Sequence, residues 1–446
     1  MKASALALAA YGAACAAACG AAPAPETERA PPPITADPST KPIADAIVHV
    51  YDALTVKTVA PGDPAPIRQA AVLSLGWTAP IPWTTDPEKD RGLLRGVVRA
   101  LAQSGKLPAD AVLRAARSMG VWSGDLQTYG VDPAGFAALF GLIAGQPVVQ
   151  PGMTYHQVAR PVTSSAAAAP EWAVADLIPG GPAQRAGVAR GDVLITIDGA
   201  PIVHGWKDFQ YLLGARPGIP AKLVVKHAGA ERTLTLALAP IATPIVESRM
   251  LGRGIGYLRV WTCTHSEVPR LDAALLAQRA LVALDRKGVN KLVVDLRGNA
   301  GGFPFDLASL FTAADPLMYA LVPFGDDRPI AHTKIAPWKG THPIAVLVDE
   351  GTASGAEMVA LALREDSGAV VVGEPTAGGL TFPTTEQLIG NVTLSYPSAK
   401  VGTAKDKLVQ DGNRLTPDVI APNPTAEDYA AKRDPQLAAA LARLTS

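Results

Sequence analysis

The chain has 446 residues, and its 40 lysines and arginines balance its 40 aspartates and glutamates. This length exceeds what one ordinary hydrophobic core fills, so we expect two or three folded domains. A formal net charge of zero, without a basic run that contains aromatic residues, argues against nucleic acid or an anionic membrane surface as the partner.

Residues 1–20 have the layout of a secretory signal, with one cation (Lys2), a short apolar run and then small residues. The run is too short for a committed transmembrane span. Cys19, between three alanines and Gly20, resembles a bacterial lipoprotein cleavage site, although the usual leucine three residues earlier is absent. Lipidation of Cys19 and plain signal cleavage both stay open. Either route predicts export to the bacterial periplasm or cell envelope, with residues 21–41, rich in alanine and proline, as a linker.

Cys263 would then be the only cysteine of the folded part, which excludes an internal disulfide. No cysteine and histidine spacing typical of zinc sites occurs anywhere in the sequence. We therefore expect neither a metal nor an organic cofactor.

Residues 42–148 are predicted to form a helical N-terminal domain, because apolar residues recur there at helical spacing. Gly105 and Gly120 are candidate C-caps that would end two of the helices. The segments with this spacing are 43–54, 91–105 and 109–120. The next stretch, 151–170, reads as a connector.

Residues 168–240 alternate short strands and helices. Strands are predicted at WAVADL and VLITIDG, helices at PAQRAG and WKDFQYLLG, and a final strand pair at KLVVKH and TLTLAL. Gly181-Pro182-Ala183, Ala186-Gly187-Val188 and Gly191-Asp192 make the segment resemble a PDZ domain of the type found in bacterial proteases. Such domains bind the C-terminal tail of a peptide or protein by strand addition. The alternative is that the module only packs against its neighbour and gates it.

Residues 245–425 alternate strands and helices more regularly, which predicts a mostly parallel sheet with its site at the carboxyl ends of the strands. A C-terminal helix is expected over residues 426–446. Two strand ends carry candidate chemistry. The sequence Arg297-Gly298-Asn299-Ala300-Gly301-Gly302 follows one strand, and Ser354 begins the helix after another. Backbone amides of the glycine turn and of Gly355 could stabilise an oxyanion formed when Ser354 attacks a carbonyl. Ser354 and Glu357 also fit a capping box, which needs no catalytic role.

Four motifs in order, DLRGNAGG, GTASGAE, GEPTAGG and TPDV, make the chain resemble the family of C-terminal processing, or tail-specific, serine peptidases. The resemblance implies an α/β fold. A ClpP/crotonase-like peptidase domain would carry an inserted PDZ domain, a small β-rich α+β module, and an N-terminal helical domain. It also implies that Ser354 is the nucleophile, and that Gly301 or Gly302 forms the oxyanion hole with Gly355.

The general base of this family departs from its usual pattern here. The bacterial branch places a lysine at the position of Gly379 and a partner glutamine at that of Pro383. The branch that resembles the tricorn core instead uses a histidine, matched here by Gln127, and a glutamate, whose nearest match is Asp411. Neither arrangement is complete in this chain.

His265 is the remaining candidate, because it follows the carboxyl end of a strand that should run parallel to the two strands of the site. A solvated loop histidine is the competing interpretation. The other histidines lie in the PDZ segment, at the start of a strand, in a polar loop or, as His49 and His156 do, far from every matched motif. Two functions therefore stay open. One is a serine-type peptidase that uses His265, a water bound to Gln127 or another base, and the other is a pseudopeptidase that binds peptide tails.

Overall fold

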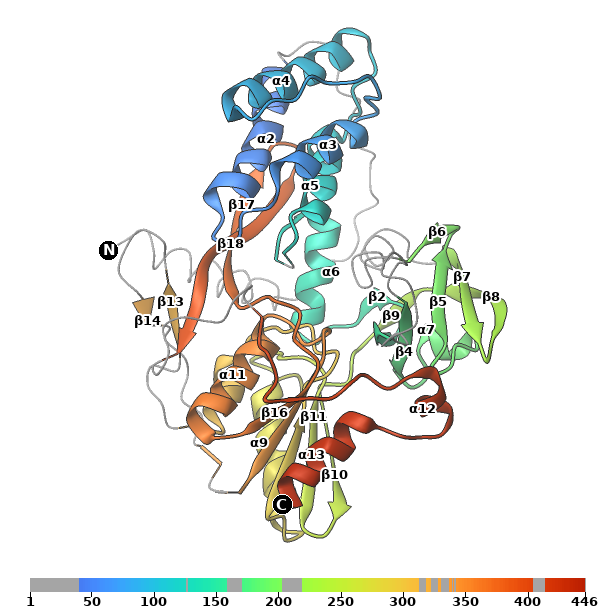
Figure 1. Cartoon of the computed structure of the whole chain (residues 1–446), viewed down its shortest axis with the longest axis vertical. Coiled ribbons are helices and arrows are strands. Elements are labelled where there is room, and N and C mark those ends of the chain that lie inside the picture. The colour runs from blue at the N-terminus through green and yellow to red at the C-terminus, as the bar shows by residue number, and fades with distance from the viewer. Residues whose placement is uncertain are drawn as a thin grey trace. The chain divides into compact units, whose positions relative to one another are not determined.

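The computed structural model describes residues 40–125, 127–158, 171–202, 219–312, 318–321, 328–329, 337–338, 340, 342–403 and 414–445 (Figure 1). They belong to two compact units, Met1–Phe140 with Phe382–Ala399, and Gly141–Thr381 with Lys400–Ser446. The predicted signal, residues 21–39 of the predicted linker, Asp411 and the helix expected at WKDFQYLLG lie outside the described residues, whereas Lys41, the last residue of that linker, begins a helix. No helix among the described residues is long and apolar enough to span a membrane.

The first unit is helical, as predicted for this region. Asp63 and Asp86 each accept a hydrogen bond from a backbone amide in the first turn of the helix that follows, and a proline fills the first helical position. Gly105 follows the end of its helix, but Gly120 lies inside one, so the prediction that Gly120 is a C-cap was wrong. The elements are α2 (Lys41–Asp52), the π-helix η1 (Ala53–Lys57), α3 (Pro64–Ser74), α4 (Pro87–Gln103), α5 (Ala111–Trp122) and α6 (Pro133–Ile143), the last of which runs into the second unit.

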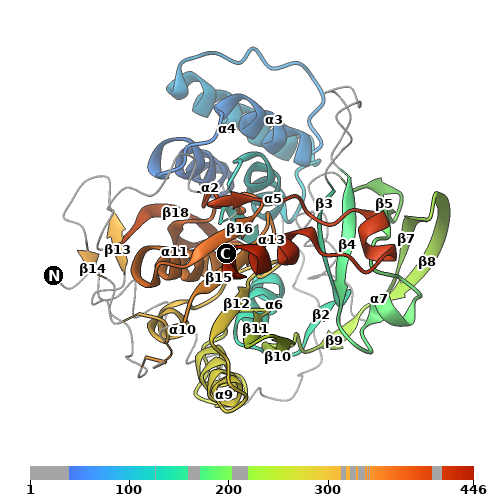
Figure 2. The same ribbon diagram turned by 60° about the horizontal axis from the view of Figure 1, so that its bottom comes forward.

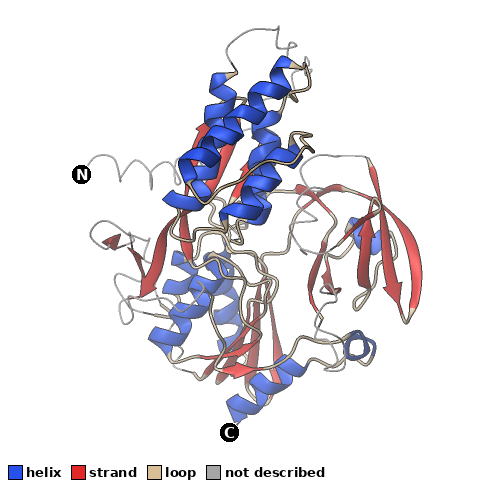
Figure 3. Cartoon of the chain, turned by 45° about the horizontal axis from the view of Figure 1, so that its top comes forward, coloured by secondary structure: helices blue, strands red, loops and turns tan. Residues whose placement is uncertain are grey.

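A β-hairpin from late in the chain completes the core of the first unit (Figure 3). Val392, Leu394 and Tyr396 of β18 (Val392–Thr403) are buried against the helices, and β17 (Thr381–Leu388) pairs with β18. The short strand β1 (Tyr129–Val131) pairs antiparallel with β18 as well. The N-terminal helices therefore share their core with a segment that follows most of the second unit in sequence.

The PDZ module in the second unit contains a sheet of order β3-β4-β5-β7-β8, with β6 paired to β5. The predicted strands are present, but part of the predicted connector is also a strand, β3, at the edge of this sheet. The assignment of 151–170 as a connector was therefore wrong for β3. The elements are β3 (Met153–Gln157), β4 (Trp172–Leu177), α7 (Pro182–Arg185), β5 (Val193–Ile197), β6 (Ala200–Pro201), β7 (Pro220–His227) and β8 (Ala230–Ala237).

The peptidase sheet has the order β10-β11-β12-β15-β16-β19 and is parallel except for β10, as the alternation of strands and helices predicted. Helices α9, α10 and α11 lie on one face and α13 on the other (Figure 2). The strands are β10 (Val246–Gly252), β11 (Ile255–Val260), β12 (Lys291–Asp295), β15 (Ile344–Val348), β16 (Val370–Gly373) and β19 (Val419–Ile420). The helices are α9 (Ala273–Asp285), α10 (Phe305–Ser309), α11 (Gly355–Ser367), α12 (Ala426–Ala430) and α13 (Pro435–Thr445).

The C-terminal helix predicted over 426–446 is two helices, because the chain turns between α12 and α13. Lys432 has a φ of 55° in this turn, a left-handed conformation that a continuous right-handed helix does not contain. Four short strands complete the fold. The pair β2 (Val148–Gln150) and β9 (Ala239–Ile241) is antiparallel, and β13 (Met318–Leu321) pairs with β14 (Arg328–Pro329) and with the last residues of β18.

Candidate active site

Ser354 lies immediately before α11, at the carboxyl end of the buried strand β15. Its backbone has φ 50° and ψ −119°, a combination that non-glycine residues rarely adopt. The strained turn is anchored to the neighbouring strand end, because the amide of Ala353 donates to the carbonyl of Asn299 at 2.9 Å. The serine is thus held at the position that the sequence predicted, in a conformation that its surroundings enforce.

The glycine turn after β12 contacts this serine directly. A Cβ atom at Gly301 would lie 2.9 Å from the Cβ of Ser354 and 2.8 Å from the amide nitrogen of Gly355. One at Gly355 would lie 2.4 Å from the carbonyl oxygen of Gly302. Only glycines permit this approach of the two backbones. The turn and the start of α11 are therefore brought together, as the motifs implied.

The two amides of the glycine turn differ in availability. The amide of Gly301 donates to the side-chain oxygen of Asn299 at 2.9 Å, and the Asn299 side chain is itself fixed because its amide group donates to Val260 O at 3.0 Å. Gly302 has a φ of 123° and bridges to Cys263 in a parallel register. Of the two glycines that the sequence left open, Gly302 is the better candidate to donate a hydrogen bond to an oxyanion beside Gly355.

Glu357, fully buried in the first turn of α11, holds the serine turn from the other side. Its carboxylate accepts hydrogen bonds from the amides of Ser354 (2.8 Å), Gly378 (3.0 Å) and Gly379 (2.6 Å), and from the Thr376 hydroxyl. Burial raises the pKa of Glu357 to about 7, although these hydrogen bonds act to lower it. Sequence analysis gave Glu357 only the role of a helix cap and did not anticipate that it connects α11 to the Gly378-Gly379 turn.

Gly379 occupies the place at which the bacterial branch of the family has its lysine. A Cβ atom at this position would lie 3.0 Å from the Ser354 amide nitrogen and 3.1 Å from the Glu357 carboxylate. A side chain at 379 would therefore begin directly beside the candidate nucleophile. Glycine itself supplies no side chain at this position to accept a proton.

His265 lies in the loop after β11, stacked on Phe303 at 5.0 Å between ring centroids, and Phe303 follows Gly302 in the glycine turn. Its Nδ1 lies 3.4 Å from both Asp272 and Asp306. Hydrogen bonds with Asp272 and then Asp306 raise the pKa of His265 to about 10. At neutral pH the imidazole therefore carries its proton, which argues against its role as the general base.

Gln127 belongs to the first unit, where it is buried in a turn organised by Asp125. The Asp125 carboxylate accepts hydrogen bonds from the amides of Gln127 and Thr128, both at 2.8 Å. Ser354 belongs to the second unit. Asp411, the other residue matched to the tricorn-like branch, lies outside the described residues.

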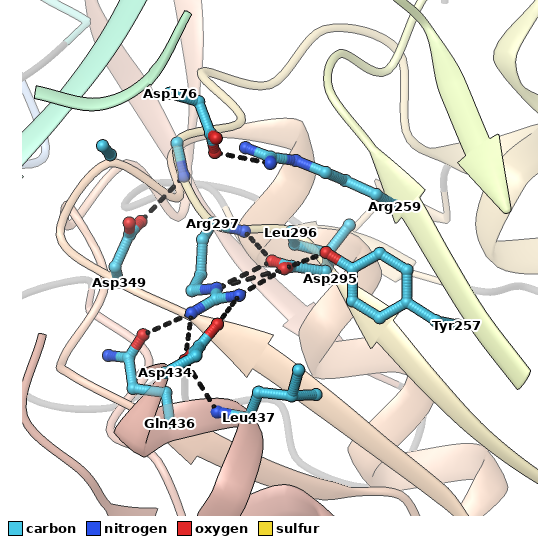
Figure 4. Close-up of polar contacts among 12 residues, drawn as sticks. Asp176, Tyr257, Arg259, Asp295, Leu296, Arg297, Asp349, Asp434, Gln436 and Leu437 are labelled. Atoms are coloured by element: carbon cyan, nitrogen blue, oxygen red, sulfur yellow. Dashed lines mark hydrogen bonds and ion pairs between the residues drawn. The ribbon is translucent and has the colours of Figure 1, made fainter. Parts of the chain in front are cut away.

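Arg297, at the start of the glycine turn, is held in a network of buried acids (Figure 4). Its guanidinium donates to Asp295 at 2.6 Å and to both carboxylate oxygens of Asp434 at 2.9 Å. The Tyr257 hydroxyl donates to Asp295 at 2.6 Å. Arg297 and Arg259 keep the pKa of Asp295 well below its ordinary value despite burial. The network fixes the turn that contacts Ser354.

His156 was predicted to be far from every matched motif, and this prediction was wrong, because the folded chain brings it close to the glycine turn. It lies on β3 and lines one cavity together with Arg297 and Gly298. One ring nitrogen lies 3.0 Å from the carbonyl oxygen of Pro424, and burial lowers the pKa of His156. The error arose because β3 itself was not recognised in the sequence.

In the described part of the chain, no group of three or more histidine, cysteine or acidic residues is arranged to hold a metal.

Comparison with known proteins agrees with this arrangement. Residues 254–421 match the sequence profile of Peptidase family S41, and residues 174–226 match that of the PDZ domain. The chain is 31% identical over 266 residues to the chloroplastic carboxyl-terminal-processing peptidase 2 of Arabidopsis thaliana, covering 57% of this chain and 50% of the relative. It is 29% identical over 261 residues to the carboxy-terminal processing protease CtpA of Bacillus subtilis (strain 168), covering 57% of this chain and 53% of that protein. The chain thus spans about half the length of these curated relatives.

The solved structure of a photosystem II D1 C-terminal processing protease is similar in fold, with a TM-score of 0.50 and 23% identity over 86% of this chain and 93% of that one. The profile matches cover the sheet with Ser354 and the module with β4 to β7, the two parts on which the resemblance in sequence rested. Residues 254–421 thus match Peptidase family S41 and residues 174–226 match the PDZ domain, and the chain is similar to proteins named C-terminal processing proteases.

Proposed function

We propose that this protein is a serine-type peptidase that cleaves peptides or protein tails with Ser354 as its nucleophile. The observation that carries the proposal is the approach of the glycine turn to Ser354, where a Cβ at Gly301 would lie 2.9 Å from the serine Cβ. This approach brings backbone amides to the reactive hydroxyl, as acyl transfer requires. Relatives named as C-terminal processing proteases support the same chemistry.

In the proposed reaction, the Ser354 hydroxyl attacks the carbonyl carbon of the scissile bond. The carbonyl oxygen gains negative charge and accepts hydrogen bonds from the amides of Gly302 and Gly355. These donors lie on a rigid turn and at a helix N-terminus, where the helix dipole also favours an anion. The acyl-enzyme is then hydrolysed by water, which regenerates the serine.

None of the three residues considered for the role of general base has the chemistry of a base at neutral pH. Gly379 stands in place of the lysine, Gln127 ends in an amide, and His265 is protonated because its pKa is raised to about 10. A serine hydrolase without its base loses on the order of 10⁴- to 10⁶-fold in rate, while the oxyanion hole retains some catalysis. We therefore propose slow hydrolysis at neutral pH and a rate that increases as His265 loses its proton.

The same observations favour a second candidate function, a catalytically impaired pseudopeptidase that binds peptide tails. The support for binding is the PDZ module itself, because domains of this type bind extended peptides by strand addition. Binding of this kind needs neither a base nor an activated serine. It is the function that remains if Ser354 does not react.

A hydrolysis assay separates the two candidates. A peptide library with free C-terminal carboxylates, incubated between about pH 6 and pH 11, would be analysed by mass spectrometry. The peptidase proposal expects cleavage that increases toward high pH and disappears in Ser354→Ala. Peptide binding with no cleavage at any pH would leave only the scaffold function.

We also propose that residues 1–20 direct export to the bacterial periplasm or cell envelope, with Cys19 as a site of lipidation. The support is the order of charge, apolar run and small residues in the sequence. Expression in a bacterial host with isotopically labelled palmitate tests the anchor. Label in the wild type and none in Cys19→Ser is expected, whereas export of both without label would mean plain cleavage.

A further inference from the structure

A cavity of about 680 Å³ lies between the PDZ module and the peptidase domain, within the second unit. Strands β3 and β4 line it from the PDZ side, β10 and β11 from the peptidase side, and the turn between α12 and α13 also contributes. Its volume falls within the roughly 300–1,000 Å³ that is typical of ligand sites.

The PDZ side of the cavity is formed by β3, the edge strand of the module's sheet, and by β4. Met153 of β3 packs in the PDZ core, Thr154 and His156 line the cavity, and Tyr155 contributes to both.

Three buried polar atoms on residues that line this cavity have no hydrogen-bond partner among the described residues. They are Arg259 Nε, Trp261 Nε1 and Thr154 Oγ1. The side chains of Arg259 and Trp261 are deeply buried, with 9% and 8% of their surface exposed. Buried donors without acceptors are rare and costly in native proteins. Two of the three atoms are N–H groups that can only donate, so a ligand that satisfies them must provide a hydrogen-bond acceptor.

Arg259 and Trp261 form one rigid donor pair. The guanidinium lies 3.6 Å from the centroid of the indole ring, and its Nη1 donates to Asp176 at 2.5 Å (Figure 4 shows the Arg259–Asp176 pair). The ion pair with Asp176 fixes the guanidinium plane, and Arg259 Nε has no acceptor among the residues that the structure describes. Arg259 lies on β11 and Trp261 follows the strand two positions later, and both side chains line the cavity.

Three of the four acids that line the cavity are already engaged. Asp176 pairs with Arg259 and lies 3.4 Å from Arg190, and Asp434 pairs with Arg297. Asp349 accepts hydrogen bonds from the amides of Gly298 and Gly351, at 2.9 and 3.0 Å. The lining contains six lysines and arginines against four aspartates and glutamates, so its formal charge favours an anion.

We propose that this cavity binds a carboxylate, which accepts hydrogen bonds from Arg259 Nε and Trp261 Nε1. A carboxylate is planar and can accept from two neighbouring donors at once. Each carboxylate group carries a single charge, which suits a guanidinium that Asp176 already partly neutralises, whereas phosphate would concentrate two charges on the one group beside these donors. The ligand is a small dicarboxylate or the carboxyl terminus of a peptide. The site does not depend on catalysis by Ser354.

Calorimetric titration of the full chain with succinate tests the site, with succinamide as a neutral ligand of equal size. Succinate should bind the wild type and succinamide should not. Trp261→Phe keeps an aromatic ring and removes the N–H, and should weaken succinate binding about 10- to 150-fold, the effect of one hydrogen bond to a charged group. Arg259→Lys keeps the charge but removes the Nε donor and should weaken it similarly.

Trp338→Phe is the matched control, because the Trp338 indole donates to Asp285, away from the cavity, at 2.8 Å. Its affinity for succinate should equal that of the wild type. Thermal unfolding tests whether each variant is folded. If one of them is not, the titration uses Thr154→Val in its place, which removes the third unpaired polar atom. Absence of succinate binding to the wild type, or equal affinity in Trp261→Phe and Arg259→Lys, would overturn the proposal.

A pair of peptides identifies the source of the carboxylate. One ends in a free carboxylate and the other is its C-terminal amide, and both are titrated into the wild type and Trp261→Phe. If amidation weakens binding in the wild type but not in Trp261→Phe, a peptide terminus occupies the cavity. If amidation has the same effect in both while succinate still depends on Trp261, the ligand is a small dicarboxylate.

Discussion

Gly301 lies against Ser354 so closely that a methyl group on Gly301 would be 2.9 Å from the serine Cβ. It would also be 2.7 Å from the carbonyl oxygen of Ala353, and Gly301 itself has a φ of 101°. The glycine turn and the serine turn therefore fit together only while position 301 has no side chain. The proposed oxyanion hole depends on this contact.

Gly301→Ala should reduce kcat/KM on the order of 100-fold, because the added methyl group displaces the backbone donors from Ser354. Steady-state kinetics on a cleaved peptide measure the loss. Gly390→Ala is the control, since Gly390 also has a positive φ (76°) but nothing within 4 Å of an added Cβ. That variant should lose only about 1 kcal/mol of stability from backbone strain and keep its activity. Equal activity in both variants would contradict the proposed site.

Glu357→Gln should lower both activity and stability. The amide group of glutamine presents a donor to a site where Ser354, Thr376, Gly378 and Gly379 all donate. We expect a loss of about 1.5–3 kcal/mol in the free energy of unfolding, the contribution of hydrogen bonds to a charged group. Denaturant titration measures it. Glu365→Gln, at the partly exposed end of the same helix, should change stability by less than about 1 kcal/mol.

Arg297→Leu should destabilise the second unit strongly, because it leaves Asp295 and Asp434 without their main cation. Removal of one partner from a buried ion pair costs about 3–5 kcal/mol. Arg433→Leu removes an arginine whose side chain is 62% exposed and should cost less than about 1 kcal/mol. If chemical denaturation gives equal losses for the two variants, the network does not anchor the glycine turn.

The pairing of His265 with Asp272 and Asp306 predicts how stability depends on pH. The pKa is raised to about 10 from an ordinary value of 6.5, so the folded state binds the proton more tightly than the unfolded state. The stabilisation should be complete below pH 6.5 and lost as pH increases through about 10. His265→Gln should lack this component when unfolding is measured across the range. A wild type and variant with parallel pH profiles would exclude the raised pKa.

The parallel sheet was predictable because its strands are continuous apolar runs that end in glycine-rich turns, as in KLVVDLRGNAGG. Ser354 and the turn at Gly301 were predictable because their motifs follow such apolar runs. The hairpin β17–β18 was not, because its partners in the helical core lie at the other end of the chain. Strand β3 was missed because it directly precedes a segment rich in alanine and proline, and its pairing with β4 is not visible in a local pattern.

The protonation and the hydrogen bonds of the site residues were less predictable than their positions in the chain. His265 was located correctly at a strand end, but the acids that hold its proton come from the start of α9 and from α10. Glu357 was recognised as a cap, whereas its bonds to Gly378 and Gly379 depend on a loop that follows β16. Local sequence gave no sign of either set of contacts.

Labelling with a fluorophosphonate probe tests most directly whether Ser354 is a reactive nucleophile. The probe reacts only with a serine that is accessible and activated. The account predicts slow labelling of the wild type, located at Ser354 by peptide mapping, no labelling of Ser354→Ala, and faster labelling toward pH 10. Absence of labelling in the folded wild type at every pH, or equal labelling of Ser354→Ala, would contradict it.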